Sequence, residues 1–244
     1  MATERSWKPL SLFYVEYPEA DAFGKLLAYS SMVPIFIIFS IITLIMSRRD
    51  LHTIFYFCGC LINELSNYFL KYIIKQPRPF PTIHLGIKSS GMPSNHAQFM
   101  GFFCVYIGFF LFIRLVKPLL IRLFRLNQRS FSRQFTTFVY LVCASVTAVV
   151  CYSRYLEFLI ISRVYLLYHT STQVLVGIII GGIFGMIWFL IVQYAITPIF
   201  PRFTDSWIGQ LLMLQDFTHI NNLMHFEYTI VQNYIHRTKS ERPT

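Results

Sequence analysis

Long runs of apolar residues, separated by short polar stretches, dominate this chain. They cover residues 26–46, 51–74, 97–116, 135–151 and 174–196, with a continuation of the fourth run into residues 155–161 as an open alternative. A helix needs about 20 apolar residues to cross the hydrocarbon core of a bilayer. Inside the bilayer, backbone groups must bond within their own segment. The pattern therefore predicts an all-α integral membrane protein, a bundle of about five transmembrane helices.

The pattern also divides the chain into three parts. Residues 1–25 are polar and precede the first run, which we expect to remain as an anchor because no cleavable signal peptide is visible. Residues 26–196 form the transmembrane domain, and residues 197–244 form a tail in which residues 207–234 are predicted to be an interfacial amphipathic helix. In the fifth run, Gly181, Gly182 and Gly185 predict close packing against another helix.

Composition strengthens the membrane assignment and narrows the partners. Hydrophobic residues make up 55% of the chain and charged residues only 13%, which does not fit a soluble globule. The net charge of +10 would suggest nucleic acid in a soluble protein, but here the basic residues collect in loops, so no nucleic-acid partner is expected. The five cysteines lie inside apolar runs without the spacing of a disulfide framework or zinc site. No metal or cofactor is expected.

Loop charges predict the orientation of the bundle. The loop after the first run begins Arg48-Arg49, and the loop after the third run carries basic residues but no acidic ones. Those basic residues are Arg114, Lys117, Arg122, Arg125, Arg129 and Arg133. Because positive loops stay in the cytosol, the N-terminal segment and the residues between the second and third runs face the lumen or exterior, and the tail is cytosolic.

Basic residues on the opposite side of the membrane need another explanation. Lys71 and Arg78 lie seven residues apart at the end of the second run, about two helical turns, so they are expected to face the same way. A guanidinium fork fits phosphate oxygens, and an ammonium adds a point charge. The alternative is that both are ordinary basic residues at a membrane boundary.

A second motif, Pro93-Ser94-Asn95-His96, leads into the third run. Free backbone N–H groups and the helix dipole make a helix start favourable for anions. His96 titrates near neutrality and can supply a proton. The alternative is that Ser94 or Asn95 only caps the helix, and we expect a capping role in either case.

A third motif, Ser162-Arg163 followed by His169, precedes the fifth run. It adds a second guanidinium and a second histidine. Taken alone, a single histidine at a membrane interface is more often structural.

The three motifs together, Lys-x6-Arg-Pro, Pro-Ser-x-His and Ser-Arg-x5-His, resemble the type 2 phosphatidic acid phosphatase superfamily over roughly residues 65–175. The resemblance implies that His169 attacks phosphorus to form a phosphohistidine and that His96 protonates the leaving oxygen. It implies no metal, because fixed cations replace it. The residues implied to hold the phosphate oxygens are Lys71, Arg78, Ser94 and Arg163.

A narrower resemblance is to the dolichyldiphosphatases. It rests on residues 14–18 (Tyr-Val-Glu-Tyr-Pro), Asn63-Glu64, Asn67 and residues 226–229 (Phe-Glu-Tyr-Thr). It implies hydrolysis of dolichyl diphosphate to dolichyl phosphate and phosphate at the lumenal face of the endoplasmic reticulum, which recycles the carrier for protein N-glycosylation. The implied partners are a polyisoprenyl diphosphate lipid and membrane lipids, and no protein partner is specified.

Two other functions are compatible with the motifs. A broader lipid phosphatase, acting on phosphatidate or a sphingoid phosphate, would use the same residues. A lipid-binding or scramblase-like protein would lack catalysis, although both histidines are present. A vanadium haloperoxidase fits least, because a lipid-embedded site suits a lipid substrate.

The chain departs from the superfamily pattern at three places. Gln173 stands four residues after His169, where many members have an aspartate that orients the imidazole, and Asn95 stands where many have glycine or serine. The Ser-Arg pair before His169 is also doubled, at Ser153-Arg154 and Ser162-Arg163, so that residues 155–163 look inserted and Arg154 rivals Arg163 as the phosphate ligand. The alternative to a real insert is a splice variant or an error in the assigned exons.

Glu64 is the only acidic residue inside the first three runs. With Asn67 and Lys71 it follows the i, i+3, i+7 spacing of one helix face. A charge inside a membrane is expected to face the bundle interior. The stripe either supports Lys71 or packs helices together.

Overall fold

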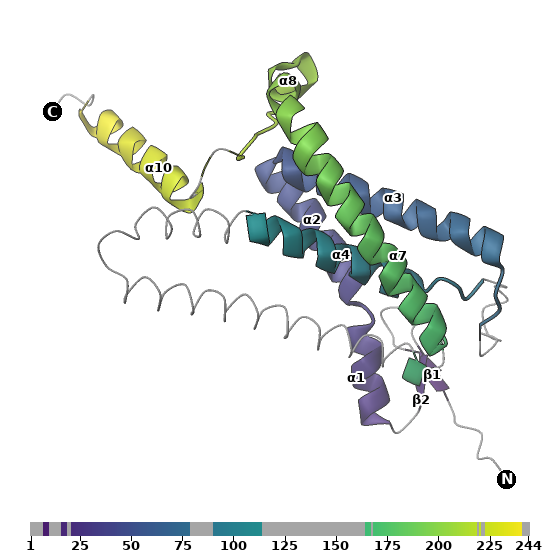
Figure 1. Ribbon diagram of the computed structural model, residues 1–244. Coiled ribbons are helices and arrows are strands. Elements are labelled where there is room, and N and C mark those ends of the chain that lie inside the picture. The colour runs from purple at the N-terminus through teal and green to yellow at the C-terminus, as the bar shows by residue number, and fades with distance from the viewer. Residues whose placement is uncertain are drawn as a thin grey trace, which may run out of the picture.

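The computed structural model describes residues 7–9, 16–18, 21–78, 90–113, 164–166, 168–218, 220 and 223–240. Over these residues the chain is helical apart from a short antiparallel ribbon (Figure 1), so the predicted helical fold is confirmed there. The strands are β1 (Trp7–Pro9) and β2 (Glu16–Pro18). The principal helices are α1 (Ala22–Ser30), α2 (Val33–Arg48), α3 (Leu51–Ile74), α4 (Asn95–Leu111), α7 (Ser171–Leu190) and α10 (Leu223–Ser240).

The predicted runs match these helices unevenly. The second run coincides with α3, and the fifth corresponds to α7 and its π-helical continuation Ile191–Ile196. The third run begins two residues after α4 does, and α4 ends earlier, at Leu111. The fourth run, the basic loop before it and the apparent insert lie outside the described residues.

The first run is not one continuous helix, which corrects the prediction for residues 26–46. A turn separates α1 from α2, and Pro34 lies in the first turn of α2, where its missing N–H is tolerated. Because Pro34 cannot donate to the carbonyl four residues earlier, the helix is interrupted there. Ser30 and Ser31 satisfy the preceding carbonyls, since their hydroxyls donate to Leu27 O and Ala28 O at 2.7 Å each.

Glycines bring α4 and α7 into backbone contact. A Cβ on Gly181 would lie 2.0 Å from Gln98 O, and one on Gly185 would lie 2.7 Å from Phe102 O. Gly182, by contrast, has room for a Cβ, so only two of the three predicted glycines are required for this packing. Gly185 lies one turn after Gly181 in α7, and its contact Phe102 lies one turn after Gln98 in α4. The two helices therefore run parallel and begin at the same end of the bundle.

Buried amides join α3 to the start of α4. Asn67 Nδ2 donates to Gln98 Oε1 at 2.7 Å and to Pro93 O at 3.4 Å, and Gln98 Nε2 donates to Asn63 Oδ1 at 3.0 Å. All three amide side chains are almost fully buried. Because buried amides are costly unless bonded, this network fixes the Pro93–Ser94 turn against α3.

The outer faces of the helices are apolar. Phe39 is 62% exposed, Met46 73% and Leu65 68%, although all lie within helices. Two helical stretches, Ala22–Arg48 and Ser171–Asp205, are long and apolar enough to cross a membrane, and Asn95–Leu111 is a shorter apolar helix. These surfaces suit lipid contact, and the figure of about five spans stays a prediction.

The tail does not form the single helix predicted for residues 207–234. A short helix, α9 (Trp207–Leu211), ends before Met213, whose φ of 52° is left-handed and stops helical propagation. Gln215 then pairs with the α2–α3 turn, its N–H donating to Arg49 O and its carbonyl accepting from Leu51 N–H, both at 3.0 Å. The last helix, α10, is amphipathic in sequence and extends away from the bundle in Figure 1.

Candidate active site

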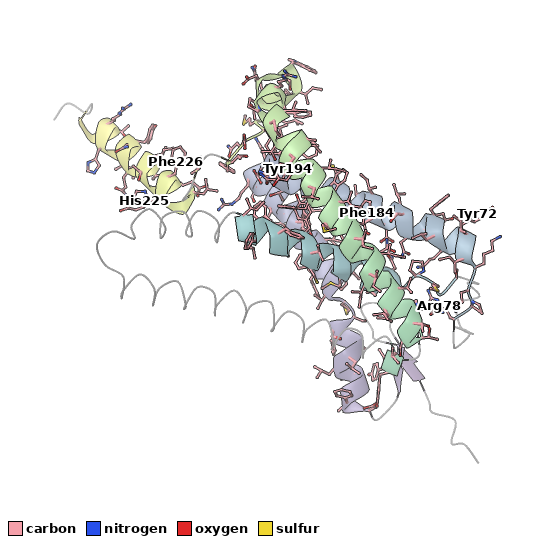
Figure 2. The ribbon with its side chains drawn as sticks, viewed as in Figure 1. Tyr72, Arg78, Phe184, Tyr194, His225 and Phe226 are labelled. Carbon is pink, nitrogen blue, oxygen red and sulfur yellow. The ribbon has the colours of Figure 1, made fainter. Side chains whose placement is uncertain are left out.

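The predicted site residues that the structure describes lie where α4 and α7 begin and along the C-terminal part of α3. In Figure 2, Arg78 lies between the end of α3 and the start of α7. The Ser94 N–H donates to Gln173 O at 3.2 Å, which joins the two helix starts directly. Two neighbouring helix N-termini place their positive dipole ends here, so this end of the bundle favours an anion.

His169 is buried just before α7, with 5% of its surface exposed. Its Nδ1 lies 2.9 Å from Gly91 O and 3.2 Å from Gln173 Oε1. Because both partners are acceptors, Nδ1 must carry the proton in the neutral ring. This tautomer leaves the imidazole lone pair on Nε2, the atom that can act as a nucleophile.

The orientation of the Gln173 amide follows from its backbone partners. Its Oε1 accepts from Thr170 N–H at 3.3 Å, and its Nε2 donates to Pro77 O at 3.1 Å. Thr170 reciprocates by accepting from Gln173 N–H, which makes a capping box at the start of α7. Since an N–H only donates and a carbonyl only accepts, these contacts fix Oε1 toward His169.

Ser94 occupies the N-cap position of α4, but its side chain makes no capping hydrogen bond, which corrects the expectation of a capping role. The residue is fully buried, and its Oγ has no hydrogen-bond partner among the residues that the structure describes. A buried hydroxyl without a partner is costly. Its position at a helix start marks it as a group that a bound anion would satisfy.

Lys71 and Arg78 come together without sharing a helix face. The helix ends at Ile74, and Lys75 follows with a left-handed φ of 50°, so Arg78 lies beyond the helix and the two-turn prediction was wrong. The two cations are nevertheless close enough to repel each other. Such an arrangement is stabilised by an anion between them.

Arg78 is half-buried, and its Nε has no hydrogen-bond partner in the described part of the chain. Burial lowers the pKa of the Arg78 guanidinium, and nearby Tyr168 acts in the opposite direction. Arginine remains charged throughout the physiological pH range. The unsatisfied Nε–H is therefore a second donor for an anion.

His96, the second residue of α4, is partly buried, and neighbouring Asn95 contacts α3. Asn95 Nδ2 donates to Glu64 Oε1 at 2.6 Å. Glu64 is exposed, so the expectation that it faces the bundle interior was wrong, whereas Asn67 on the same helix is buried. Thus Asn67 packs helices together, while Glu64 attracts Lys71 electrostatically and bonds Asn95.

Arg163 and its rival Arg154 lie outside the described residues. Sequence reasoning missed the carbonyls of Gly91 and Pro77, because backbone acceptors leave no direct residue signature. Gly91 left an indirect one: a Cβ there would lie 2.9 Å from the Gln173 amide, so a larger residue would displace that amide.

Comparisons with known proteins identify the family of this chain. A profile of the PAP2 superfamily matches residues 52–197. The chain is 39% identical to human "Dolichyldiphosphatase 1" over 93% of this chain and 89% of the relative. It is 36% identical to the protein of the same name from Dictyostelium discoideum (96% and 93% covered) and 33% identical to "Lipid phosphate phosphatase gamma" of Arabidopsis thaliana (91% and 89% covered). No solved structure matches it significantly.

Proposed function

The chain belongs to the PAP2 superfamily, and we propose that it hydrolyses dolichyl diphosphate to dolichyl phosphate and phosphate. The names and near-complete coverage of the animal and Dictyostelium relatives support this substrate. The observation that carries the chemistry is His169 Nδ1, which lies 2.9 Å from the Gly91 carbonyl and thereby leaves the lone pair on Nε2. That atom is the nucleophile of the proposed reaction.

The proposed reaction has two displacements. His169 Nε2 forms a bond to the terminal phosphorus, and the bond to the bridging oxygen breaks as His96 donates a proton to that oxygen. Dolichyl phosphate leaves, and a phosphohistidine remains. Water then attacks phosphorus, gives its proton to His96, and releases phosphate as the phosphorus–nitrogen bond breaks. Splitting one difficult step into two lowers each barrier.

Fixed cations and donors stabilise the phosphoryl oxygens in this proposal. Lys71 supplies a point charge, and Arg78 Nε–H and Ser94 O–H supply donors that have no other partner in the described structure. Arg163 supplies a second guanidinium by resemblance, with Arg154 as the alternative. Phosphoryl transfer depends mainly on positioning and charge stabilisation, so this set suffices without a metal.

The apolar outer faces and the family indicate a membrane protein. We place it in the membrane of the endoplasmic reticulum with the site at the lumenal face. Residues 1–25 are then lumenal, residues 26–196 form the multi-pass domain, and residues 197–244 are a cytosolic tail. Support comes from the positive loop charges and from the substrate, whose recycling serves lumenal N-glycosylation.

A substrate comparison with purified protein tests the proposal. Phosphate release is measured from dolichyl diphosphate, phosphatidate and a sphingoid phosphate in matched micelles. We expect the highest kcat/KM on dolichyl diphosphate. His169→Ala and His96→Ala are each expected to abolish release; full activity in either variant overturns the mechanism.

The second candidate is a broader lipid phosphatase, favoured by the Arabidopsis relative of that name. It uses the same residues, so only the substrate comparison separates the two. A clear preference for phosphatidate would replace the first candidate. Binding of the lipids without phosphate release by the wild-type protein would instead identify a non-catalytic member.

A further inference from the structure

The side chain of Gln76 lies in the short segment between α3 and Arg78. Its Oε1 accepts a hydrogen bond from Gln173 Nε2 at 3.3 Å. Its main-chain carbonyl accepts from Gly91 N–H at 2.7 Å and from Ser90 Oγ at 3.3 Å. Gln76 thus connects the segment carrying Arg78 to both other parts of the site.

The two residues that Gln76 holds are the same two that bond the nucleophile. Gly91 O and Gln173 Oε1 are the acceptors for His169 Nδ1. Gln76 bonds the N–H of the first and the side-chain amide of the second. One residue therefore braces both contacts that select the tautomer of His169.

The Gln173 amide has no spare bonding capacity to compensate for losing this contact. Its Oε1 faces His169 and Thr170, and its Nε2 faces Gln76 and Pro77. An amide has two donor hydrogens and an acceptor with two lone pairs, so all four positions are used. A carboxylate at position 173 would face two acceptor oxygens, which explains why an amide fits here.

We propose that Gln76 is a positioning residue, whose side chain holds Gln173, and through it the Nδ1–H of His169, in register with the phosphate-binding Arg78. This inference rests on the proposed phosphatase function. Gln76 itself does not touch the reacting atoms, so its effect is on the geometry of attack and appears in kcat.

Replacing Gln76 by methionine tests the inference, because methionine keeps the size of the side chain and removes the acceptor. Loss of one hydrogen bond predicts a kcat lower by roughly three- to tenfold, with KM for dolichyl diphosphate within about twofold of wild type. Gln76→Ala serves as a second variant if Gln76→Met does not fold. A wild-type kcat in the folded variant, or a change in KM alone, overturns the inference.

A conservative variant separates positioning from a general structural role. Gln76→Glu keeps an acceptor oxygen toward Gln173 Nε2, so kcat is expected to stay within about twofold, while its charge raises KM for an anionic substrate. An equal kcat loss in Gln76→Glu and Gln76→Met contradicts the proposal. Gln210→Met is the matched control, since Gln210 is exposed in α9 and its side-chain amide donates to Asp205 O, away from the proposed site.

A double-mutant cycle tests whether Gln76 acts through Gln173. The combined Gln76→Met and Gln173→Met variant is expected to lose less kcat than the product of the two single losses, because both changes break one chain of contacts. If the two losses in kcat multiply in the double variant, Gln76 does not act through Gln173.

All variants are assayed on phosphatidate as well. If the protein hydrolyses phosphatidate but not dolichyl diphosphate, the proposed substrate is rejected, and the Gln76 variants are compared on phosphatidate. If Gln76→Met keeps the wild-type kcat on the lipid that is hydrolysed, only the proposed role of Gln76 is rejected.

Discussion

At the scale of single residues, the site is recognised by polar atoms that the protein itself leaves unsatisfied. Ser94 Oγ and Arg78 Nε are buried and have no partner in the described structure. Folding does not retain such groups for stability, because a buried donor without a partner is costly. In the proposed site a bound phosphate completes their hydrogen bonds, so mutation of either should separate function from stability.

Ser94→Ala makes this separation measurable. The hydroxyl caps no helix end and is buried without a partner in the described structure, so we expect its removal to leave the free energy of unfolding unchanged or to raise it. Hydrogen bonds to charged groups contribute about 1.5–3 kcal/mol, so kcat/KM should fall by roughly 10- to 150-fold. Thermal unfolding measures the stability of the variant, and phosphate release measures its kcat/KM.

Thr170→Ala is the contrasting variant for the stability reading. Thr170 does cap its helix, through a capping box with Gln173, so its loss should cost about 1 kcal/mol of stability. If Ser94→Ala destabilises the protein as much as Thr170→Ala does, the interpretation of Ser94 as a ligand-directed group fails.

Gln173→Ala is expected to slow turnover without abolishing it. The mutation removes one acceptor of His169 Nδ1, but the Gly91 carbonyl remains at 2.9 Å and still selects the same tautomer. The loss of a buried neutral hydrogen bond predicts a decrease in kcat of roughly three- to tenfold. Steady-state phosphate release measures it, with Gln210→Ala as control. Unchanged turnover would show that Gln173 does not orient the histidine.

Sequence reasoning predicted residue types for the proposed site, but not the geometry that brings them together. Lys71 and Arg78 were found by residue type, yet the helical spacing argument failed because Lys75 adopts a left-handed conformation. The residue before proline disfavours the α region, so Gln76-Pro77 already argued against a helix at that point. Contacts made by backbone carbonyls, such as Gly91 O, depend on tertiary structure and carry no local pattern.

At the scale of secondary-structure elements, the site depends on the close approach of α4 and α7. These helices carry Ser94 and His96 at one start and Gln173 at the other, so any separation displaces both halves of the site. The approach needs glycine where a Cβ would meet backbone, as at Gly181. A backbone neighbour cannot move aside in the way that a flexible side chain can.

Gly181→Ala is therefore expected to impair stability and activity together. Its Cβ would lie 2.0 Å from Gln98 O, so the helices must shift. Overpacking of this kind costs about 1–3 kcal/mol, and kcat should fall because the two helix starts separate. The adjacent Gly182→Ala is the matched control, since its Cβ meets only Val105 Cγ2 at 3.4 Å. Equal behaviour of the two variants would contradict this account.

The sequence predicted the existence of the helices more securely than their ends. Apolar periodicity was sufficient for α3, where the acidic cap Asp50 and the polar end coincide with the limits of the run. It failed where a local conformational preference interrupts an apolar stretch, as at Pro34, or where a left-handed residue such as Met213 breaks the tail. Hydropathy measures burial in lipid and does not report backbone dihedral angles.

At the scale of the whole molecule, the two ends of the bundle have different chemistry. One end holds His96 and His169, the proposed catalytic histidines, together with the donors of Arg78 and Ser94 that are unsatisfied in the described structure. The other holds the tail, which is fastened by Gln215 at the α2–α3 turn and by an ion pair of 3.4 Å between Arg48 and Glu227. Since Arg48 and Glu227 are both substantially exposed, that ion pair contributes little energy, and the backbone pairing at Gln215 sets the position of the tail.

The proposed topology places the chain termini on opposite sides of the membrane. Five crossings, one of them in the undescribed residues, carry the chain from a lumenal start to a cytosolic tail. The sequence contains no Asn-x-Ser/Thr acceptor, so any N-glycosylation of a variant must occur at an acceptor that is introduced by mutation. An acceptor on a flexible N-terminal extension should be glycosylated, and the same acceptor on a C-terminal extension should not, as read from a mass shift that a glycosidase removes.

The two extensions serve as controls for each other, because both use the same linker and acceptor. Glycosylation at the C-terminal extension alone would reverse the orientation and place the site at the cytosolic face. Glycosylation at both would mean an even number of crossings, which contradicts five spans. Because the basic loops determine the orientation in this argument, exchanging Arg48 and Arg49 for glutamine should weaken the preference, whereas exchanging Arg78 should reduce phosphate release and leave glycosylation unchanged.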